Sequence, residues 1–120
     1  AVVRESSPVI EEEIKMSDST LKAVKSGMKK VTEEGTAKSA FQDFDIAVGG
    51  KTGTAEVPNG SSNGIFVAFA PFDNPEIAVA IVLEHGGHGS AAAPIARAVF
   101  ETYFENKGIE DMYQQRVLLK

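Results

Sequence analysis

The first helical pattern of apolar residues falls between Ser17 and Gly35. Ser17 or Asp18 can cap the start of a helix there, and Gly35 is expected to end it in a left-handed conformation. Intervals of three and four residues separate the apolar positions, which are Leu21, Val24, Met28 and Val31. We expect this stripe to be buried and the opposite side of the helix to face solvent.

Three extended segments follow this helix. Residues 46–57 look extended, and residues 65–70 and 77–83 are continuous apolar runs. Turn-forming residues at 58–64 and 71–75 separate the segments, which predicts two antiparallel hairpins. Because the run IAVAIVL is apolar at every position, we expect both faces of the third strand to be covered.

A second helical pattern begins near Ser90, which can cap a helix, with Pro94 tolerated in the first turn. Gly108 is expected to end this helix. Its apolar stripe consists of Ile95, Val99, Phe100, Tyr103 and Phe104. Residues 1–14 are predicted to form two short extended pieces, and residues 109–120 a C-terminal tail that adds at most a short helix.

These elements predict an α/β fold of the α+β type, with an antiparallel β-sheet core and helices packed on both faces. A length of 120 residues with 42% hydrophobic and 24% charged residues is typical of one globular domain, or of part of a larger one. The net charge of −5, without any basic cluster, argues against nucleic-acid binding. No apolar run approaches the ~20 residues of a membrane span, so we expect no membrane contact by this segment. The absence of cysteine excludes disulfides and cysteine-bound zinc.

The segment with the most distinctive chemistry is AVGGKTGTAE, residues 47–56. A phosphate-binding loop would need a glycine in place of Asp45 and a helix after Thr52, but the residues that follow predict a strand and a turn. An edge strand with Lys51 as a solubilising charge is the alternative without chemistry. On a strand, Thr52 and Thr54 lie on one side, so their hydroxyl groups can bind one carboxylate together. Gly53, between them, lets a substrate approach the backbone closely.

The segments around this motif resemble a known family. In order, they are GTAKSAF, VGGKTGTAEV, NGIFVAFAPFDNPEIAVAIVLEHG and SAAAPIARAVFETYF. Together they cover roughly residues 17–106 and are similar to the C-terminal part of the transpeptidase domain of penicillin-binding proteins, above all the class B, monofunctional enzymes of cell elongation. Residues 1–120 are therefore expected to be one incomplete domain of the penicillin-binding protein and serine β-lactamase type.

The resemblance implies D,D-transpeptidation in peptidoglycan cross-linking through a serine acyl-enzyme. Its substrates would be stem peptides that end in D-Ala-D-Ala, β-lactams would acylate the same serine, and no metal or organic cofactor is implied. The parent protein would act on the extracytoplasmic face of the bacterial cytoplasmic membrane, held by an N-terminal anchor. By the same resemblance, Lys51 polarises the site and assists proton transfer, and the backbone amide of Thr54 donates to the oxyanion. Lys51, Thr52, Gly53 and Thr54 together would bind the substrate.

No residue of this chain fits the role of the nucleophile. In the family, the acylated serine and its partner lysine lie far upstream of the Lys-Thr-Gly motif, so the remainder of the domain is expected to supply them. Ser26 and Ser19 have the Ser-x-x-Lys spacing, but Ser26 falls opposite the apolar stripe and should face solvent, and Ser19 is placed nearly as badly. The Ser-x-Asn spacing at Ser61 follows Lys51 and lies in a turn. The chain alone is expected to be inactive.

Two other functions stay open at this point. One is a related serine acyl-enzyme, either a β-lactamase or a penicillin-sensing domain. The other is a non-catalytic interaction module. The three differ in acylation: transpeptidases turn over the acyl-enzyme slowly, β-lactamases do so rapidly, and an interaction module forms none.

A few further side chains have the right chemistry but weak patterns. His85, His88 and Glu84 could bind a metal ion, yet a glycine-rich turn between a strand and a helix explains their segment better, and we expect no metal site. Glu56 is expected to be a surface carboxylate, and Arg97 a solvated or packing residue.

Overall fold

A three-stranded antiparallel sheet forms the centre of the computed structural model, which describes residues 6–119. The strands are adjacent in the order in which they occur in the sequence, as two hairpins require. The three predicted strands and the α+β class are therefore confirmed. In chain order the elements are α1 (Asp18–Glu33), α2 (Lys38–Phe41), β1 (Gly49–Ala55), β2 (Asn63–Ala70), β3 (Ile77–Leu83), the 3-10 helix η1 (Gly89–Ala92) and α3 (Ala93–Leu118).

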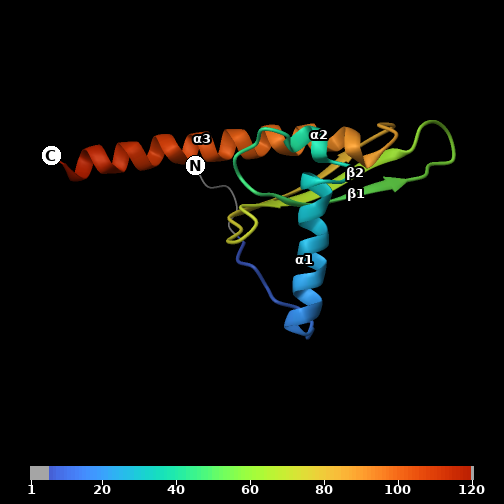
Figure 1. The fold of residues 1–120 in the computed structure, drawn as a ribbon, viewed down its shortest axis with the longest axis horizontal. Helices are drawn as coiled ribbons and strands as arrows, with labels where there is room; N and C mark the ends of the chain where they lie inside the picture. Colours follow the sequence, from blue (N-terminus) through green and yellow to red (C-terminus); the bar gives the residue numbers. More distant parts are fainter. Residues whose placement is uncertain (1–5, 120) are drawn as a thin grey trace.

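The helices are distributed unevenly around the sheet. Helices α2 and α3 lie along one side of it, and α1 crosses the start of β1 and extends to the other side (Figure 1). Lys25 of α1 reaches over the ring of Phe69, which is on the opposite face of β2 from the buried Phe66. No helix in the described part of the chain runs along the length of that second face.

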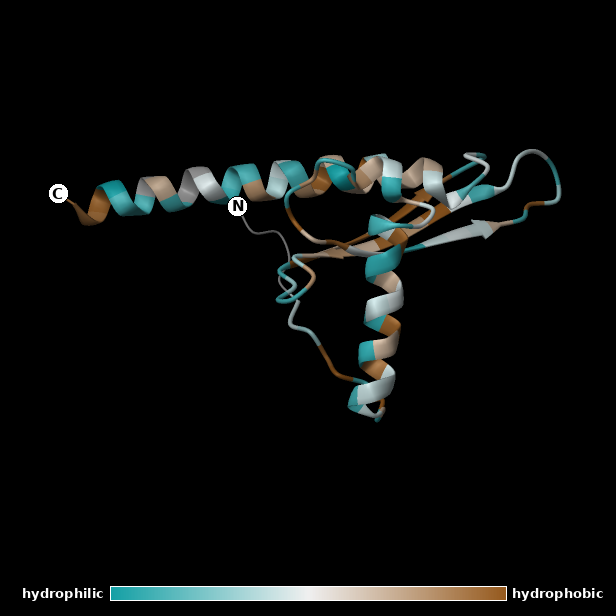
Figure 2. Ribbon diagram, in the orientation of Figure 1, coloured by the Kyte–Doolittle hydropathy of each residue, from teal (hydrophilic) through white to brown (hydrophobic). Residues whose placement is uncertain are grey.

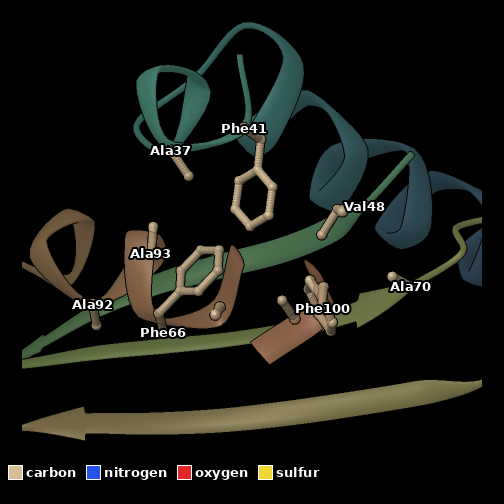
Figure 3. Close-up of a cluster of buried hydrophobic side chains, with 10 residues drawn as sticks. Ala37, Phe41, Val48, Phe66, Ala70, Ala92, Ala93 and Phe100 are labelled. Carbon is tan, nitrogen blue, oxygen red and sulfur yellow. The ribbon is translucent and has the colours of Figure 1, made fainter. Parts of the chain in front are cut away.

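The core lies between β2, α2 and α3 (Figure 3). Alternate residues of β2 point into it, and the rings of Phe41, Phe66 and Phe100 meet there, with the Phe41 ring centroid 6.1 Å from that of Phe66 and 6.4 Å from that of Phe100. Aromatic pairs at such distances contribute beyond their buried area. The buried apolar residues are Ala37, Phe41, Val48, Phe66, Ala68, Ala70, Ala92, Ala93, Ala96 and Phe100.

The buried side of α3 differs from the predicted stripe. Phe100 is fully buried and Phe104 packs against the core as predicted, but Ile95 is 43% exposed, and Val99 and Tyr103 are exposed as well. Alanines take their places: Ala93 and Ala96 face the sheet. Because alanine is small, the helix can lie close to the strands, and the larger residues are turned to its flank.

Both predicted ends of α3 were wrong. Ser90 lies inside η1, so α3 begins three residues later, at Ala93, with Pro94 in its first turn. Gly108 does not end the helix, which continues to Leu118 and extends well beyond the sheet (Figure 1). An interior glycine costs a helix only about 1 kcal/mol relative to alanine, too little to stop a long one. No described helix is both long enough and apolar enough to cross a membrane.

Helix α1 starts as predicted but is oriented differently. The Ser17 side chain caps it by accepting a hydrogen bond from the amide of Thr20 at 3.2 Å. Leu21 and Val24, expected to be buried, are 47% and 54% exposed, because the N-terminal half of α1 projects away from the sheet (Figure 2). Gly35 follows the helix without the predicted left-handed conformation, which among the described glycines occurs at residues 60 and 87.

Two further expectations were wrong. Strand β3 is covered on one face only: Ala78, Ala80 and Val82 are exposed, Val82 by 63%. Residues 6–14 are exposed and form no strand, and residues 1–5 of the predicted extended segment lie outside the described residues. The short helix α2 was not predicted, because four residues are too few to display a period.

Candidate functional site

Strand β1 carries all four of the predicted site residues, Lys51, Thr52, Gly53 and Thr54. It pairs with β2 along one side only, so it is an edge strand of the described sheet. An edge strand has backbone amide and carbonyl groups with which an extended peptide can pair. The position of the motif therefore suits the recognition of a peptide chain.

Lys51 is an exposed cation without a carboxylate partner in the part of the chain that the structure describes. Its Nζ donates a hydrogen bond to the carbonyl oxygen of Thr52 at 2.6 Å. That contact holds the ammonium group beside the motif without neutralising its charge. Lys51 can thus attract an anion to this edge of the sheet.

The two threonines of the motif differ in their surroundings. Thr52 is half-buried, and its Oγ1 lies 3.1 Å from Oγ1 of Thr36, in the turn between α1 and α2. Thr54, two residues along the same strand, is exposed. Sequence reasoning missed Thr36, although it belongs to the GTAKSAF segment, because nothing in the linear pattern places this turn beside β1.

Glycines let neighbouring segments pack directly on the backbone of β1. Gly89, at the start of η1, is buried against β1 and β2: a Cβ atom there would lie 2.7 Å from the amide nitrogen of Gly53 and 2.5 Å from the carbonyl oxygen of Ile65. Gly50 is close to the ring of Phe66, where a Cβ atom would lie 2.7 Å from the tip of the ring. The motif strand is therefore held by close contacts that side chains would prevent.

The histidine segment serves as a turn. The backbone amide of His85 donates a hydrogen bond to the side-chain oxygen of Asn63 at 3.0 Å, and the His85 Nδ1 lies 3.0 Å from the carbonyl oxygen of Ser61. Gly87 donates to the carbonyl oxygen of Ser62 at 2.8 Å. These bonds tie the loop after β3 to the loop before β2. Among the side chains that the structure describes, no three potential metal ligands cluster.

The serines with suggestive spacing lie in exposed positions. Ser19, Ser26 and Ser61 are all exposed, as expected for the first two from the helical pattern. The lysine three residues after Ser26, Lys29, pairs with Glu33 at 3.4 Å. A serine nucleophile needs an adjacent base that is free to take its proton, and Ser26 has no such partner among its described hydrogen bonds.

Two other candidates have surface or packing positions. Glu56 is exposed just beyond β1. Arg97 joins α3 to the segment around α2, donating to the carbonyl oxygens of Ala40 at 3.1 Å and Gln42 at 2.6 Å and to the Glu101 carboxylate at 2.8 Å. Arg97 thus helps to fix the segment that follows Thr36.

Comparisons with known proteins identify the family of the chain. Residues 2–101 match the family model of the penicillin binding protein transpeptidase domain. The peptidoglycan D,D-transpeptidase MrdA of Haemophilus influenzae is 38% identical over 103 residues, which cover 71% of this chain and 16% of that protein. The chain thus spans a small part of the length of such relatives.

Solved structures share the fold. PBP2 of Pseudomonas aeruginosa, crystallised in complex with WCK 5153, has a TM-score of 0.71 and 35% identity, covering 80% of this chain and 23% of that one. Penicillin-binding protein A of M. tuberculosis, solved as an imipenem acyl-enzyme complex, has a TM-score of 0.55 and 32% identity, covering 72% of this chain and 19% of that one.

Proposed function

The chain belongs to the penicillin-binding protein transpeptidase family and resembles its elongation-type members, and on this premise we propose that it forms one wall of the active site of a peptidoglycan D,D-transpeptidase. The observation that carries the proposal is the edge strand β1, which carries Lys51, whose Nζ is held at the Thr52 carbonyl oxygen, and the hydroxyl groups of Thr52 and Thr54. A cation and two hydroxyl donors on an open strand suit a peptide that ends in a carboxylate.

In this proposal the residues of β1 bind and orient the substrate. The D-Ala-D-Ala terminus of a stem peptide lies along the edge of β1, and its carboxylate accepts hydrogen bonds from Thr52 and Thr54. Lys51 supplies positive charge and assists proton transfer, and the amide of Thr54 donates to the oxyanion of the tetrahedral intermediate. A β-lactam carries a carboxylate and a reactive carbonyl in a similar relation, so it occupies the same edge. Loss of one oxyanion donor typically costs about 3 kcal/mol of transition-state stabilisation.

The serine nucleophile belongs, in this proposal, to parts of the parent protein outside this chain. The exposure of Ser26 and the engagement of Lys29 with Glu33 support that assignment. Exposed apolar side chains on the second face of the sheet and on α1 give a surface against which the rest of the domain packs: Val67, Val82, Leu21 and Val24. No metal or organic cofactor takes part.

The parent protein is proposed to act on the extracytoplasmic face of the cytoplasmic membrane. Its substrate, peptidoglycan, is assembled there, and an anchor in a segment outside this chain would hold it near the substrate. The described residues supply no helix suited to that role.

Acylation by a fluorescent penicillin tests the proposal in the complete transpeptidase that contains this segment. We expect Lys51→Ala to slow acylation about 100-fold or more, as for the loss of a preorganised charge, and to leave the unfolding curve unchanged. Lys30→Ala, which removes an exposed lysine of α1, is the matched control and should react like the wild type. Wild-type acylation of Lys51→Ala would contradict the proposed role of β1.

The isolated 120-residue chain provides a second arm of the same assay. We expect its intact mass to be unchanged after incubation with the penicillin, because the serine lies elsewhere. A stoichiometric covalent adduct on the isolated chain would contradict the missing nucleophile and would direct attention to Ser26.

A further inference from the structure

Thr36 is held firmly beside the motif strand although its own side chain is exposed. The backbone on both sides of it is hydrogen-bonded: Gly35 donates to the carbonyl oxygen of Lys30 at 2.8 Å, and Ala37 donates to that of Val31 at 3.0 Å. The side chain of Ala37 is only 1% exposed, in the core. A turn fixed in this way presents the Thr36 hydroxyl group in a defined position.

The partner of that hydroxyl group is Thr52. The two Oγ1 atoms are 3.1 Å apart, a hydrogen-bond distance in which either atom can donate. The residues are 16 positions apart in the sequence, and the contact joins the turn between α1 and α2 to β1. It is therefore a tertiary contact between two elements, in contrast to the local hydroxyl bonds at the start of α1.

A bound carboxylate would decide which hydroxyl group donates. Each threonine has one O–H donor and two acceptor positions, whereas a carboxylate only accepts. If Thr52 gives its proton to the substrate carboxylate, the remaining bond must run from the Thr36 O–H to Thr52 Oγ1. Hydrogen bonds arranged in such a chain polarise and strengthen one another.

We propose that Thr36 is a positioning residue for substrate recognition, donating to Thr52 so that the hydroxyl group of Thr52 points at the substrate carboxylate. The proposal rests on the proposed function, in which Thr52 binds that carboxylate, and it assigns to the same site a third threonine, which lies outside the motif strand. Thr36 itself does not touch the substrate. Its contribution is to hold the hydroxyl group of Thr52 in one orientation before the substrate arrives.

The test compares two probes that differ only in the carboxylate, benzylpenicillin and its methyl ester, in the complete transpeptidase that contains this segment. Thr36→Val removes the hydroxyl group and keeps the β-branched shape. The loss of an ordinary hydrogen bond raises the activation free energy by an amount that corresponds to a rate about three- to tenfold lower. We therefore expect acylation by benzylpenicillin to slow by that factor. Acylation by the ester should not change, and Thr36→Ser should restore the rate with benzylpenicillin.

Two further variants make the outcome decisive. Thr102→Val is the matched control, since it removes an exposed hydroxyl group that donates to the Ala98 carbonyl oxygen within α3, and it should not affect either rate. Thr52→Val should slow acylation by benzylpenicillin at least as much as Thr36→Val does. An equal slowing of both probes by Thr36→Val would overturn the inference, because it would indicate a merely structural effect.

The inference and the proposed function fail in different ways. If Thr52→Val slows acylation by benzylpenicillin while Thr36→Val does not, Thr36 has no positioning role. The proposed binding of the substrate by β1 is then unaffected. If Thr52→Val reacts with benzylpenicillin as the wild type does, the carboxylate role of Thr52 is overturned, and the role of Thr36 with it.

Discussion

Substitution of Gly89 by alanine should force η1 away from the strand that carries the motif. Gly89 is buried directly on the backbone of β1 and β2, and an added Cβ atom would lie 2.5 Å from the carbonyl oxygen of Ile65 and 2.7 Å from the amide nitrogen of Gly53. It would be closer still to the carbonyl oxygen of Gly53. All three atoms belong to the backbone of paired strands, so none can swing aside as the end of a flexible side chain can.

The size of the effect follows from this geometry. Extra volume in a packed region usually costs about 1–3 kcal/mol, and the lower values apply where side chains can rearrange. Because Gly89 meets only paired backbone, we expect a loss near the upper end, about 3 kcal/mol of unfolding free energy. Relief of the contact would also displace Gly53, so acylation should slow in the molecules that remain folded.

Urea denaturation of the complete transpeptidase, followed by circular dichroism, measures the first effect, and acylation by a fluorescent penicillin measures the second. Gly108→Ala is the matched control, because Gly108 lies inside α3 with open space around its Cβ position. The same added methyl group should there stabilise the helix by about 0.5–1 kcal/mol. If Gly89→Ala unfolds at the wild-type urea concentration and acylates at the wild-type rate, the packing of η1 on β1 is not as described.

Two further predictions concern the contacts that hold α1 and α3. Thr32 is buried, and its Oγ1 donates to the carbonyl oxygen of Val48 at 2.7 Å. Thr32→Val should therefore lower the unfolding free energy by about 1–2 kcal/mol, while Thr32→Ser should not. Equal urea midpoints for the wild type and both variants would contradict this prediction. The hydrogen bond to Glu76, at 2.5 Å, raises the pKa of Lys107 above 10.5. Because the pKa of Lys107 is raised in the folded state, this contact gives stability that is present below pH 10.5 and is lost as the pH rises through the folded-state pKa. The difference in Tm between the wild type and Lys107→Met should therefore be constant from about pH 7 to 9 and shrink at higher pH. A Tm difference that grows with rising pH would contradict this prediction.

Patterns of large residues predicted the strands well and the buried faces of the helices poorly. A continuous apolar run between turn-forming residues has few alternatives to a strand, so β2 and β3 followed directly from the sequence. The buried face of α3 instead depends on Ala93 and Ala96, whose small side chains contribute little to a hydrophobic pattern. Their role becomes visible only when the distance between helix and sheet is known.

The glycines also show that a local sequence pattern does not determine where a helix ends. Gly35 and Gly108 were predicted to end helices, because glycine often does, but neither adopts a left-handed conformation. Gly108 lies within a helix that continues on both sides of it, and Gly35 is placed where a Cβ atom would be 3.0 Å from the Cα of Val31. A glycine in a sequence can indicate a backbone conformation that other residues rarely adopt, or a close contact in which a side chain would not fit. Only the tertiary structure distinguishes these two cases.

The residues of the candidate site divide in the same way. The motif on β1 could be identified from its local sequence and from the resemblance of its neighbours, whereas Thr36 and Gly89 reach β1 through the packing of distant segments. Both contact the strand without belonging to the motif, one through a hydroxyl group and the other through close backbone packing. A site that must hold a carboxylate in a fixed orientation needs support of this kind, since a strand at the edge of a sheet is otherwise free to move. We therefore expect the rate of acylation to depend on residues that never meet the substrate, with Thr36 affecting only probes that carry a carboxylate and Gly89 affecting every probe.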